Sequence, residues 1–221
     1  MIAAGTEREI AELLDDFELY CRETLKVKTK AGDIVPFVLN RAQKHIDSLL
    51  DKQLLTTGKV RAILLKGRQQ GASTYIGARF YKKTSTEFGK NTFILTHEQA
   101  ATDNLFDMTK RYHTHCPLAP HSAADNAKEL WFDLLDSRFK VATAGAKATG
   151  RSATAQYFHG SEVAFWPNAA DHMAGIGQTV PNEPGTEMIF ESTGNGIGNP
   201  FHQRSEEPRL NSSHDQRSRM P

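Results

Sequence analysis

The stretch that decides the fold reads Leu64-Leu65-Lys66-Gly67-Arg68-Gln69-Gln70-Gly71-Ala72-Ser73-Thr74. Before it, Val60 to Leu65 is a mostly apolar run of the kind that buried parallel strands show. After it, apolar side chains recur at helical spacing from Tyr75 onward. A strand, a short loop bounded by glycines and a helix that opens with Ser-Thr predict a phosphate-binding loop, because loop amides and the positive end of a helix attract an anion.

This loop departs from the usual phosphate-binding pattern at the position of its cation. The pattern G-x-x-x-x-G-K-[ST] has a lysine where Ala72 stands, and Gly67 lies one residue too close to Gly71. We expect Arg68, helped by Lys66, to replace that lysine and act in catalysis, because a guanidinium can bind two phosphate oxygens. Contacts to ATP are predicted for the whole segment, namely Lys66, Gly67, Arg68, Gln69, Gln70, Gly71, Ala72, Ser73 and Thr74, with the Ser73 hydroxyl also a ligand of Mg²⁺. The alternative is a plain tight turn between a core strand and a core helix.

Size and composition limit the classes of protein to which the chain can belong. At 221 residues and 24.6 kDa, the chain is long enough for one substantial domain, and 24% charged residues are ordinary for a globular protein. The net charge of +1 gives no sign of nucleic-acid binding, although a motor that grips DNA through a local patch would not need a basic excess. No apolar run is long enough to span a bilayer, so no membrane partner is expected. Cys21 and Cys116 lie far apart, which is consistent with reduced thiols in a cytosolic protein.

The hydrophobic pattern predicts an α/β fold with a mostly parallel sheet, flanking helices and a small N-terminal hairpin, and the glycine-bounded loop between strand and helix favours a P-loop NTPase. Thr6 and Glu9 predict a capping box before the first helix, and Asn40 can cap a later one. The glycines Gly175 and Gly177 are expected to break the helix that begins near Pro167. The strands predicted are Leu25–Thr29 and Ile34–Val38 as a hairpin, Val60–Leu65, Thr92–Thr96, Glu129–Phe132 and Phe139–Ala142 as a second hairpin, Ala155–His159 and Thr186–Ser192, with a helix from His97 to Tyr112.

Two strand ends carry residues suited to ATP hydrolysis. Glu162 follows a strand and is a candidate for the catalytic carboxylate that polarises the attacking water. Ser161 stands where such sites usually have a metal-holding aspartate, and it could accept only from a water bound to Mg²⁺. At the end of the last strand, Ser192, Thr193 and Asn195 are short polar side chains that can touch the γ-phosphate. The alternatives are a surface glutamate and an Asn-Gly turn.

Two further groups are candidates for binding the base and the DNA. Gln43 can read an adenine edge through its amide donor and acceptor together, with the Phe37 ring beside the base. The alternative for Gln43 is a surface position at the start of a helix. Lys147 and Arg151 lie in a basic loop suited to phosphate or DNA-backbone contact, and a solvated loop is an equally open alternative.

The last residues differ from the rest. From Arg204 to Pro221 the chain has no periodicity and resembles translated sequencing-adapter DNA, so we expect a disordered tail that adds nothing to the fold, and a domain over residues 1–203. The alternative is a natural disordered tail.

Together, these motifs resemble the N-terminal ATPase domain of phage terminase large subunits, the motors that package double-stranded DNA into capsids. The resemblance runs from about Leu25 to Gln203 and rests on the order of four motifs. They are the loop Gly67–Thr74, the adenine motif with Phe37 and Gln43, the region Gly150–Ser152 followed by His159–Trp166, and the coupling motif Ser192–Gly196. Ala72 and Ser161 depart from the family's pattern, and we expect no part of the family's C-terminal nuclease domain within these 221 residues.

The resemblance implies an ATP hydrolase that uses ATP and Mg²⁺ to drive double-stranded DNA into a procapsid. It also implies a portal protein, a small terminase subunit and further copies of the chain in a motor ring as partners, in the host cytoplasm. One alternative is a degenerate module that binds DNA or a portal without turnover. Another is a helicase-type ATPase. Measured ATP turnover distinguishes the degenerate binding module from the motor. The coding sequence beyond Gln203 distinguishes a helicase-type ATPase from the motor.

Overall fold

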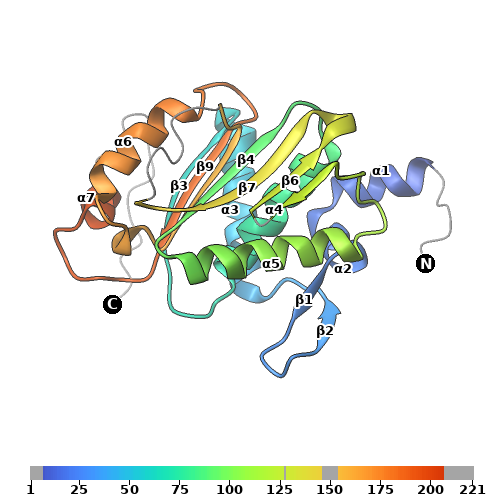
Figure 1. Ribbon diagram of the computed structural model, residues 1–221, viewed down its shortest axis with the longest axis horizontal. Coiled ribbons are helices and arrows are strands. Elements are labelled where there is room, and N and C mark those ends of the chain that lie inside the picture. Colours follow the sequence, from blue (N-terminus) through green and yellow to red (C-terminus); the bar gives the residue numbers. More distant parts are fainter. Residues whose placement is uncertain (1–6, 127, 146–153, 207–221) are drawn as a thin grey trace.

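A seven-stranded sheet forms the centre of the protein, in the strand order β3-β9-β8-β4-β7-β6-β5 (Figure 1). The structure is a computed structural model that describes residues 7–126, 128–145 and 154–206. Neighbouring strands run parallel from β3 to β7, and β6 and β5 extend the sheet antiparallel. The bounds are β3 Val60–Leu65, β4 Asn91–Thr96, β5 Ala124–Asn126, β6 Glu129–Phe132, β7 Ser137–Thr143, β8 Tyr157–Ser161 and β9 Glu187–Ser192. The predicted mostly parallel α/β fold is therefore confirmed.

The predicted N-terminal hairpin and the cap of the next helix are also confirmed. Strands β1 (Lys26–Lys28) and β2 (Ile34–Pro36) pair antiparallel, and they project from the body of the protein in Figure 1. Asn40 caps α3 (Arg41–Thr57): its side chain accepts from the Gln43 amide, and the Gln43 side chain accepts from the Asn40 amide. This reciprocal arrangement satisfies two amides that the first helical turn leaves free.

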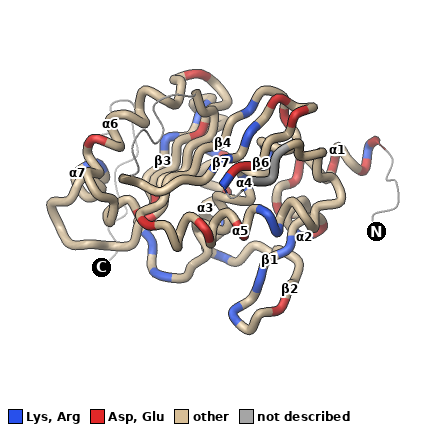
Figure 2. Tube along the Cα trace, viewed as in Figure 1, with Lys and Arg blue, Asp and Glu red and all other residues tan. Residues whose placement is uncertain are grey.

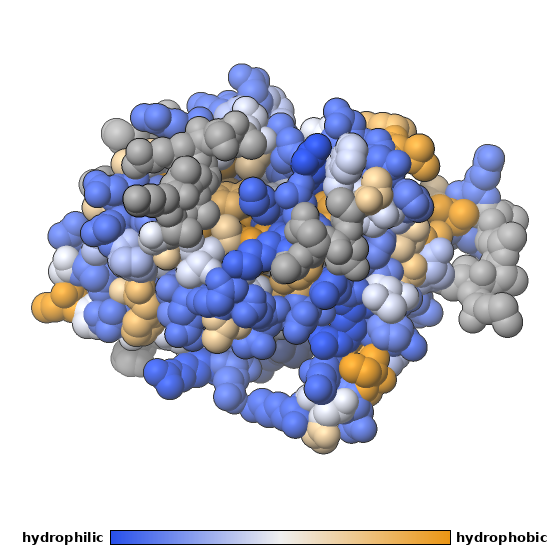
Figure 3. Space-filling view, in the orientation of Figure 1, coloured by the Kyte–Doolittle hydropathy of each residue, from blue (hydrophilic) through white to orange (hydrophobic). Residues whose placement is uncertain are grey.

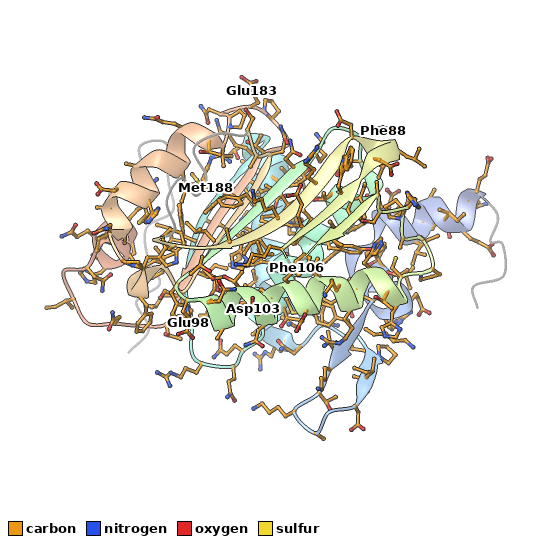
Figure 4. All side chains as sticks on the ribbon, in the orientation of Figure 1. Phe88, Glu98, Asp103, Phe106, Glu183 and Met188 are labelled. Carbon is orange, nitrogen blue, oxygen red and sulfur yellow. The ribbon has the colours of Figure 1, made fainter. Side chains whose placement is uncertain are left out.

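Helices lie on both faces of the sheet, as Figure 1 shows. Because side chains alternate between the two faces of a strand, Phe93 and Leu95 of β4 pack in one apolar cluster and Ile94 in the other. Figure 4 labels a member of each cluster: Phe106 lies with Ile94 and Met188 lies with Phe93. The helices not yet bounded are α1 Glu7–Asp15, α2 Phe17–Thr24, α4 Ala72–Thr86, α5 Gln99–His115, α6 Ala169–Thr179 and α7 Pro200–Glu206, with short 3-10 turns η1 Asp133–Leu135 and η2 Val163–Phe165.

Helix α6 corrects one prediction, because it continues through Gly175 and Gly177 to Thr179. A glycine costs a helix about 1 kcal/mol relative to alanine. The buried side chains of Met173 and Ile176 hold α6 in the second apolar cluster, and their burial of about 1.5–3 kcal/mol each outweighs that cost.

The chain ends of the fold differ from the expected bounds. The domain limit predicted after Gln203 falls inside α7, which continues to Glu206, and the Arg204 guanidinium lies 5.8 Å from the centre of the Phe190 ring. The tail beyond Glu206 and the Thr6 of the predicted capping box lie outside the described residues. The predicted N-terminal helix is divided at Asp16, which caps α2 by accepting from the Leu19 amide.

The surface is mostly polar on the face that Figure 3 shows, with small separate apolar patches. Within the described ranges, no helix has the length and apolarity needed to cross a bilayer.

Candidate functional site

The strand order brings three separate segments together at the carboxyl ends of parallel strands. Strand β9 lies between β3 and β8, with Leu65 paired to Ser192 and Ser161 paired to Glu191. The loop after β3, Glu162 after β8 and the segment after β9 therefore meet at one edge of the sheet. Ligands of open α/β sheets bind at this edge.

The loop between β3 and α4 is held by residues at the start of α3. Gly71 adopts a left-handed conformation, φ 77°, and a Cβ at this position would lie 2.6 Å from Nε2 of Gln43. The Gln43 Nε2 donates to the Gly71 carbonyl at 2.9 Å, and the Asn40 Nδ2 donates to the Gln70 carbonyl at 3.2 Å. These bonds fix the carbonyls of the loop, and within the described residues no side chain caps the first amides of α4, so these amides can face an anion at the positive end of a 15-residue helix.

The two residues of the predicted adenine motif, Phe37 and Gln43, are buried and have partners within the protein. Gln43 is 3% exposed, and its side-chain amide accepts a hydrogen bond from the Asn40 amide and donates one to the Gly71 carbonyl, so in this structure it holds the loop between β3 and α4. Phe37 is also 3% exposed, and its ring is stacked against Tyr112 with 6.2 Å between centres. Phe37 is therefore a buried residue of the core.

The two loop cations have the reverse of the predicted placement, since Lys66 faces the site and Arg68 is exposed. The Lys66 amide donates to the Ser192 carbonyl at 3.0 Å, which continues the ladder of β3 by one residue. Alternation then puts the Lys66 side chain on the same face as Leu64, whose partner in β9 is Glu191. Figure 2 shows basic residues in this loop.

Lys66 bridges two glutamates. Its Nζ lies 2.9 Å from Oε1 of Glu162 and 2.7 Å from Oε2 of Glu191, and its side chain is 11% exposed. Burial lowers the pKa of Lys66, but the charge and hydrogen bonds of Glu191 and then Glu162 outweigh this, so its pKa is raised and Lys66 is a cation at neutral pH. For Arg68, no ion pair occurs within the part of the chain that the structure describes.

Glu162 lies at the end of β8 in a strained conformation, φ 54° and ψ 47°. A left-handed conformation costs a residue with a side chain about 1–2 kcal/mol, and such strain is common at functional sites. Burial raises the pKa of Glu162, but hydrogen bonds from Lys66 and the Thr193 amide outweigh burial and hold this pKa below its ordinary value. Glu162 is therefore ionised at neutral pH. Its Oε1 accepts one hydrogen bond, from Lys66, and so can accept another from a water.

The residues after β9 bind Glu162 and the turn that follows it. The Thr193 amide and hydroxyl each donate to Oε2 of Glu162 at 3.0 Å, and the Ser192 hydroxyl lies 3.4 Å from the same oxygen. The Asn195 amide donates to the Ala164 carbonyl at 2.9 Å. The segment that follows β8 and the segment that follows β9 are thus one hydrogen-bonded unit, and this unit fixes the orientation of the Glu162 carboxylate.

Glu191 is the residue of this site that sequence reasoning missed. Its side chain is 0% exposed, and it accepts from the Ser73 hydroxyl at 2.7 Å and the Ser161 hydroxyl at 2.8 Å. Burial raises the pKa of Glu191, but His159, whose Nε2 lies 3.3 Å away, and Lys66 lower it to about 2. One signal was present: a glutamate within an apolar strand must be paired, because an isolated buried charge is very costly.

Helix α4 is anchored at the opposite end of β9 by a separate buried cluster. Glu187 is 0% exposed, and its carboxylate accepts from Arg79 at 2.8 Å and from Lys83. Arg79 also contacts Asp47 and Asp51 of α3 at 3.2 and 2.8 Å. Because α3, α4 and β9 are tied together there, the start of α4 is held in position over the carboxyl end of β9.

The polar groups suit Mg²⁺ bound to a nucleotide better than a metal held by protein alone. In the described ranges, no group of three or more His, Cys, Asp or Glu side chains could hold a metal ion. Mg²⁺ usually binds through one or two protein oxygens together with waters and substrate phosphates. Ser73 fits this role, because its single hydroxyl proton goes to Glu191 and its lone pairs remain for a cation. The DNA-contact candidates Lys147 and Arg151 lie outside the described residues.

Comparison with known proteins shows the fold to which this geometry belongs. No protein-family model matches the sequence, and no curated protein matches it. Among solved structures, the HK97 bacteriophage large terminase superposes with a TM-score of 0.64 at 14% identity, over 81% of this chain and 37% of that one. The large terminase ATPase domain of Thermus phage P74-26 gives 0.51 at 18% identity, over 65% of this chain and 62% of that one. A variant of that ATPase domain superposes with a TM-score of 0.56 at 18% identity, over 74% of this chain and 68% of that one. The chain therefore has the fold of phage large terminase ATPase domains, and it spans little more than a third of the HK97 protein.

Proposed function

We propose that this chain binds ATP with Mg²⁺ and hydrolyses it, as the ATPase domain of a viral DNA-packaging motor. The observation that carries the proposal is the unit formed by Lys66, Glu162 and Glu191 beside the start of α4. The amides at the start of α4 and the exposed Arg68 supply positive charge for the β- and γ-phosphates. Ser73 offers oxygen lone pairs to the magnesium ion, which neutralises charge on those phosphates when bound.

In this proposal Glu162 is the general base. One lone pair of its Oε1 orients a water in line with the γ-phosphorus and accepts a proton from it. The water oxygen forms a bond to phosphorus while the bond from phosphorus to the bridging oxygen breaks, and ADP leaves with that electron pair. Thr193 and Lys66 hold the carboxylate in the required orientation.

The motor role is supported by the shared fold together with the order of the motifs along the chain. The solved neighbours are described as large terminases and as a large terminase ATPase domain. Following them, we propose that hydrolysis drives double-stranded DNA into a procapsid in the host cytoplasm. The partners are then a portal protein, a small terminase subunit and other copies of this chain in a ring. Lys147 and Arg151 stay candidates for the DNA contact.

Substitution of the proposed base tests the enzymatic claim. Glu162→Gln keeps the shape of the side chain and removes its charge, so the full chain should retain ATP binding and lose at least about 100-fold of its phosphate-release rate. Glu183→Gln is the matched control, because Glu183 is exposed and lies at the amino end of β9, far from this edge (Figure 4). Parent-like phosphate release from Glu162→Gln would contradict the assignment. ATP binding by the parent without any turnover would favour a binding module that does not hydrolyse ATP.

A further inference from the structure

Two glutamates of β9 are fully buried, and their partners differ in kind. Glu187 is held by the cations Arg79 and Lys83, which close a structural ion-pair cluster. Glu191 is held by Lys66 and His159 and by two hydroxyl groups, those of Ser73 and Ser161. A hydroxyl that donates its one proton still has lone pairs, so the Glu191 cluster can bind a further group and the Glu187 cluster is complete.

The first hydroxyl is oriented by Glu191 for binding a cation. The Ser73 hydroxyl donates its proton to Oε1 of Glu191 over 2.7 Å, so its oxygen offers only lone pairs in other directions. Oxygen lone pairs are the ligands that Mg²⁺ requires. Ser73 lies in the first turn of α4, where the helix amides would face the phosphates in the nucleotide site proposed above.

The Ser161 hydroxyl indicates which side chain Glu191 replaces. Ser161 stands where sites of this kind have an aspartate that holds the metal's surroundings. Its hydroxyl donates to Oε1 of Glu191 at 2.8 Å, and the two residues are paired across β8 and β9. A carboxylate that starts from β9 at this register therefore reaches the space that an aspartate side chain from β8 would enter.

We propose that Glu191 of β9 replaces an aspartate at position 161 as the carboxylate that orients the Ser73 hydroxyl, so that the lone pairs of Ser73 can bind the magnesium ion. This inference rests on the nucleotide site proposed above. Glu191 is a positioning residue in this arrangement, and Ser161 is one of its donors. The position of β9 between the strands that carry Lys66 and Glu162 lets one carboxylate contact both the phosphate-binding loop and the end of β8.

The inference is tested by the magnesium dependence of ADP binding, which is measured without turnover. The full chain is titrated with ADP in EDTA and across a series of Mg²⁺ concentrations. In Glu191→Gln the Mg²⁺ concentration that tightens ADP binding should rise about 10- to 100-fold, the usual effect of removing a partner of a metal ligand, whatever the affinity of the variant for ADP in EDTA. Glu187→Gln removes a buried charge from the same strand and should keep the parent's magnesium dependence.

The possible outcomes distinguish the role of Glu191 from the proposed nucleotide site. If the parent fails to bind ADP with or without Mg²⁺, the proposed nucleotide site is wrong and this inference falls with it. If the parent responds to Mg²⁺ and Glu191→Gln responds equally, or if Glu187→Gln loses the response to the same extent, the role of Glu191 is refuted while the nucleotide site stands.

A second variant covers the case in which Glu191→Gln does not fold. Ser161→Asp combined with Glu191→Gln moves the carboxylate to β8 and keeps one acid beside Lys66. This double variant should recover the parent's magnesium dependence within about tenfold. A folded double variant whose ADP affinity does not respond to Mg²⁺ would overturn the proposal that the two positions are equivalent.

Discussion

Replacing Lys66 with methionine isolates the charge at the centre of the site. Methionine retains most of the volume of the lysine stem and removes the cation that lies 2.9 Å from Glu162 and 2.7 Å from Glu191. Arg68→Met is the matched control, because it removes the charge of an exposed side chain two residues further along the chain. We expect Lys66→Met to destabilise the protein strongly and Arg68→Met to leave its stability unchanged within about 0.5 kcal/mol.

The expected cost follows from the burial of Glu191, which is 0% exposed. If Glu191 stays ionised, removing its partner costs about 3–5 kcal/mol. If it takes up a proton instead, neutralising a carboxyl with an ordinary pKa of about 4.3 at pH 7 costs roughly 3.7 kcal/mol, at about 1.36 kcal/mol per pH unit. The protein adopts the cheaper state, so the loss at pH 7 is about 3–4 kcal/mol. Glu162 adds little, because its side chain is 22% exposed and water solvates it.

The sign of the pH dependence gives a second test. In the parent the pKa of Glu191 is lowered to about 2, so its stabilising contribution is present above its ordinary pKa and is lost as the pH falls toward 2. In Lys66→Met we expect burial to outweigh the remaining contact with His159 and to raise the folded pKa of Glu191 above its ordinary value, so that the folded state binds a proton that the unfolded state lacks. The destabilisation should therefore shrink as the pH falls, to about 1 kcal/mol at pH 5.

Guanidinium unfolding of the full chain at pH 7 and pH 5 measures both quantities, and thermal unfolding checks them. At about 2–4 °C per kcal/mol for a domain of this size, the midpoint at pH 7 should fall by about 6–16 °C. An unchanged midpoint in Lys66→Met would refute the argument that this cation compensates Glu191. A loss of equal size at both pH values would refute the protonation of Glu191.

Three other predictions concern the loop and the proposed base. Gly71→Ala should lower the free energy of unfolding by at least about 1 kcal/mol more than the control Gly185→Ala, as measured by guanidinium unfolding. The two glycines have similar φ angles, 77° and 79°. Of these two positions, only Gly71 would place the added Cβ against a side chain, at 2.6 Å from Nε2 of Gln43. Thr193→Val removes one donor to the Glu162 carboxylate and should lower kcat roughly 10- to 100-fold with little change in nucleotide affinity, whereas Thr193→Ser should retain kcat. Because the pKa of Glu162 lies below its ordinary value, kcat/KM should show no acid limb from Glu162 between pH 6 and 8, and a fall through that range would contradict the assignment.

The sequence by itself determined the elements whose causes are local. The apolar run Val60–Leu65, the glycine-bounded loop and the Ser-Thr helix start predict the strand, loop and helix that the structure contains. Asn40 and Gln43 form a capping box because they lie three residues apart on one helical turn. Glu162 and Ser192–Thr193 are site candidates from the sequence because ligands of parallel sheets bind at the carboxyl ends of the strands, and the structure brings these residues together there.

The tertiary structure alone decided which side chains face the site. The pairing of β9 with β3 depends on contacts between residues more than a hundred positions apart, and no local pattern contains it. That pairing brings Glu191 beside Lys66, and one further ladder bond at Lys66 fixes the face toward which its side chain points. The burial of Phe37 against Tyr112 and the contact of Gln43 with Gly71 arise in the same way. A side chain's direction and partners are set by the strands and helices packed around it, and these come from distant parts of the chain.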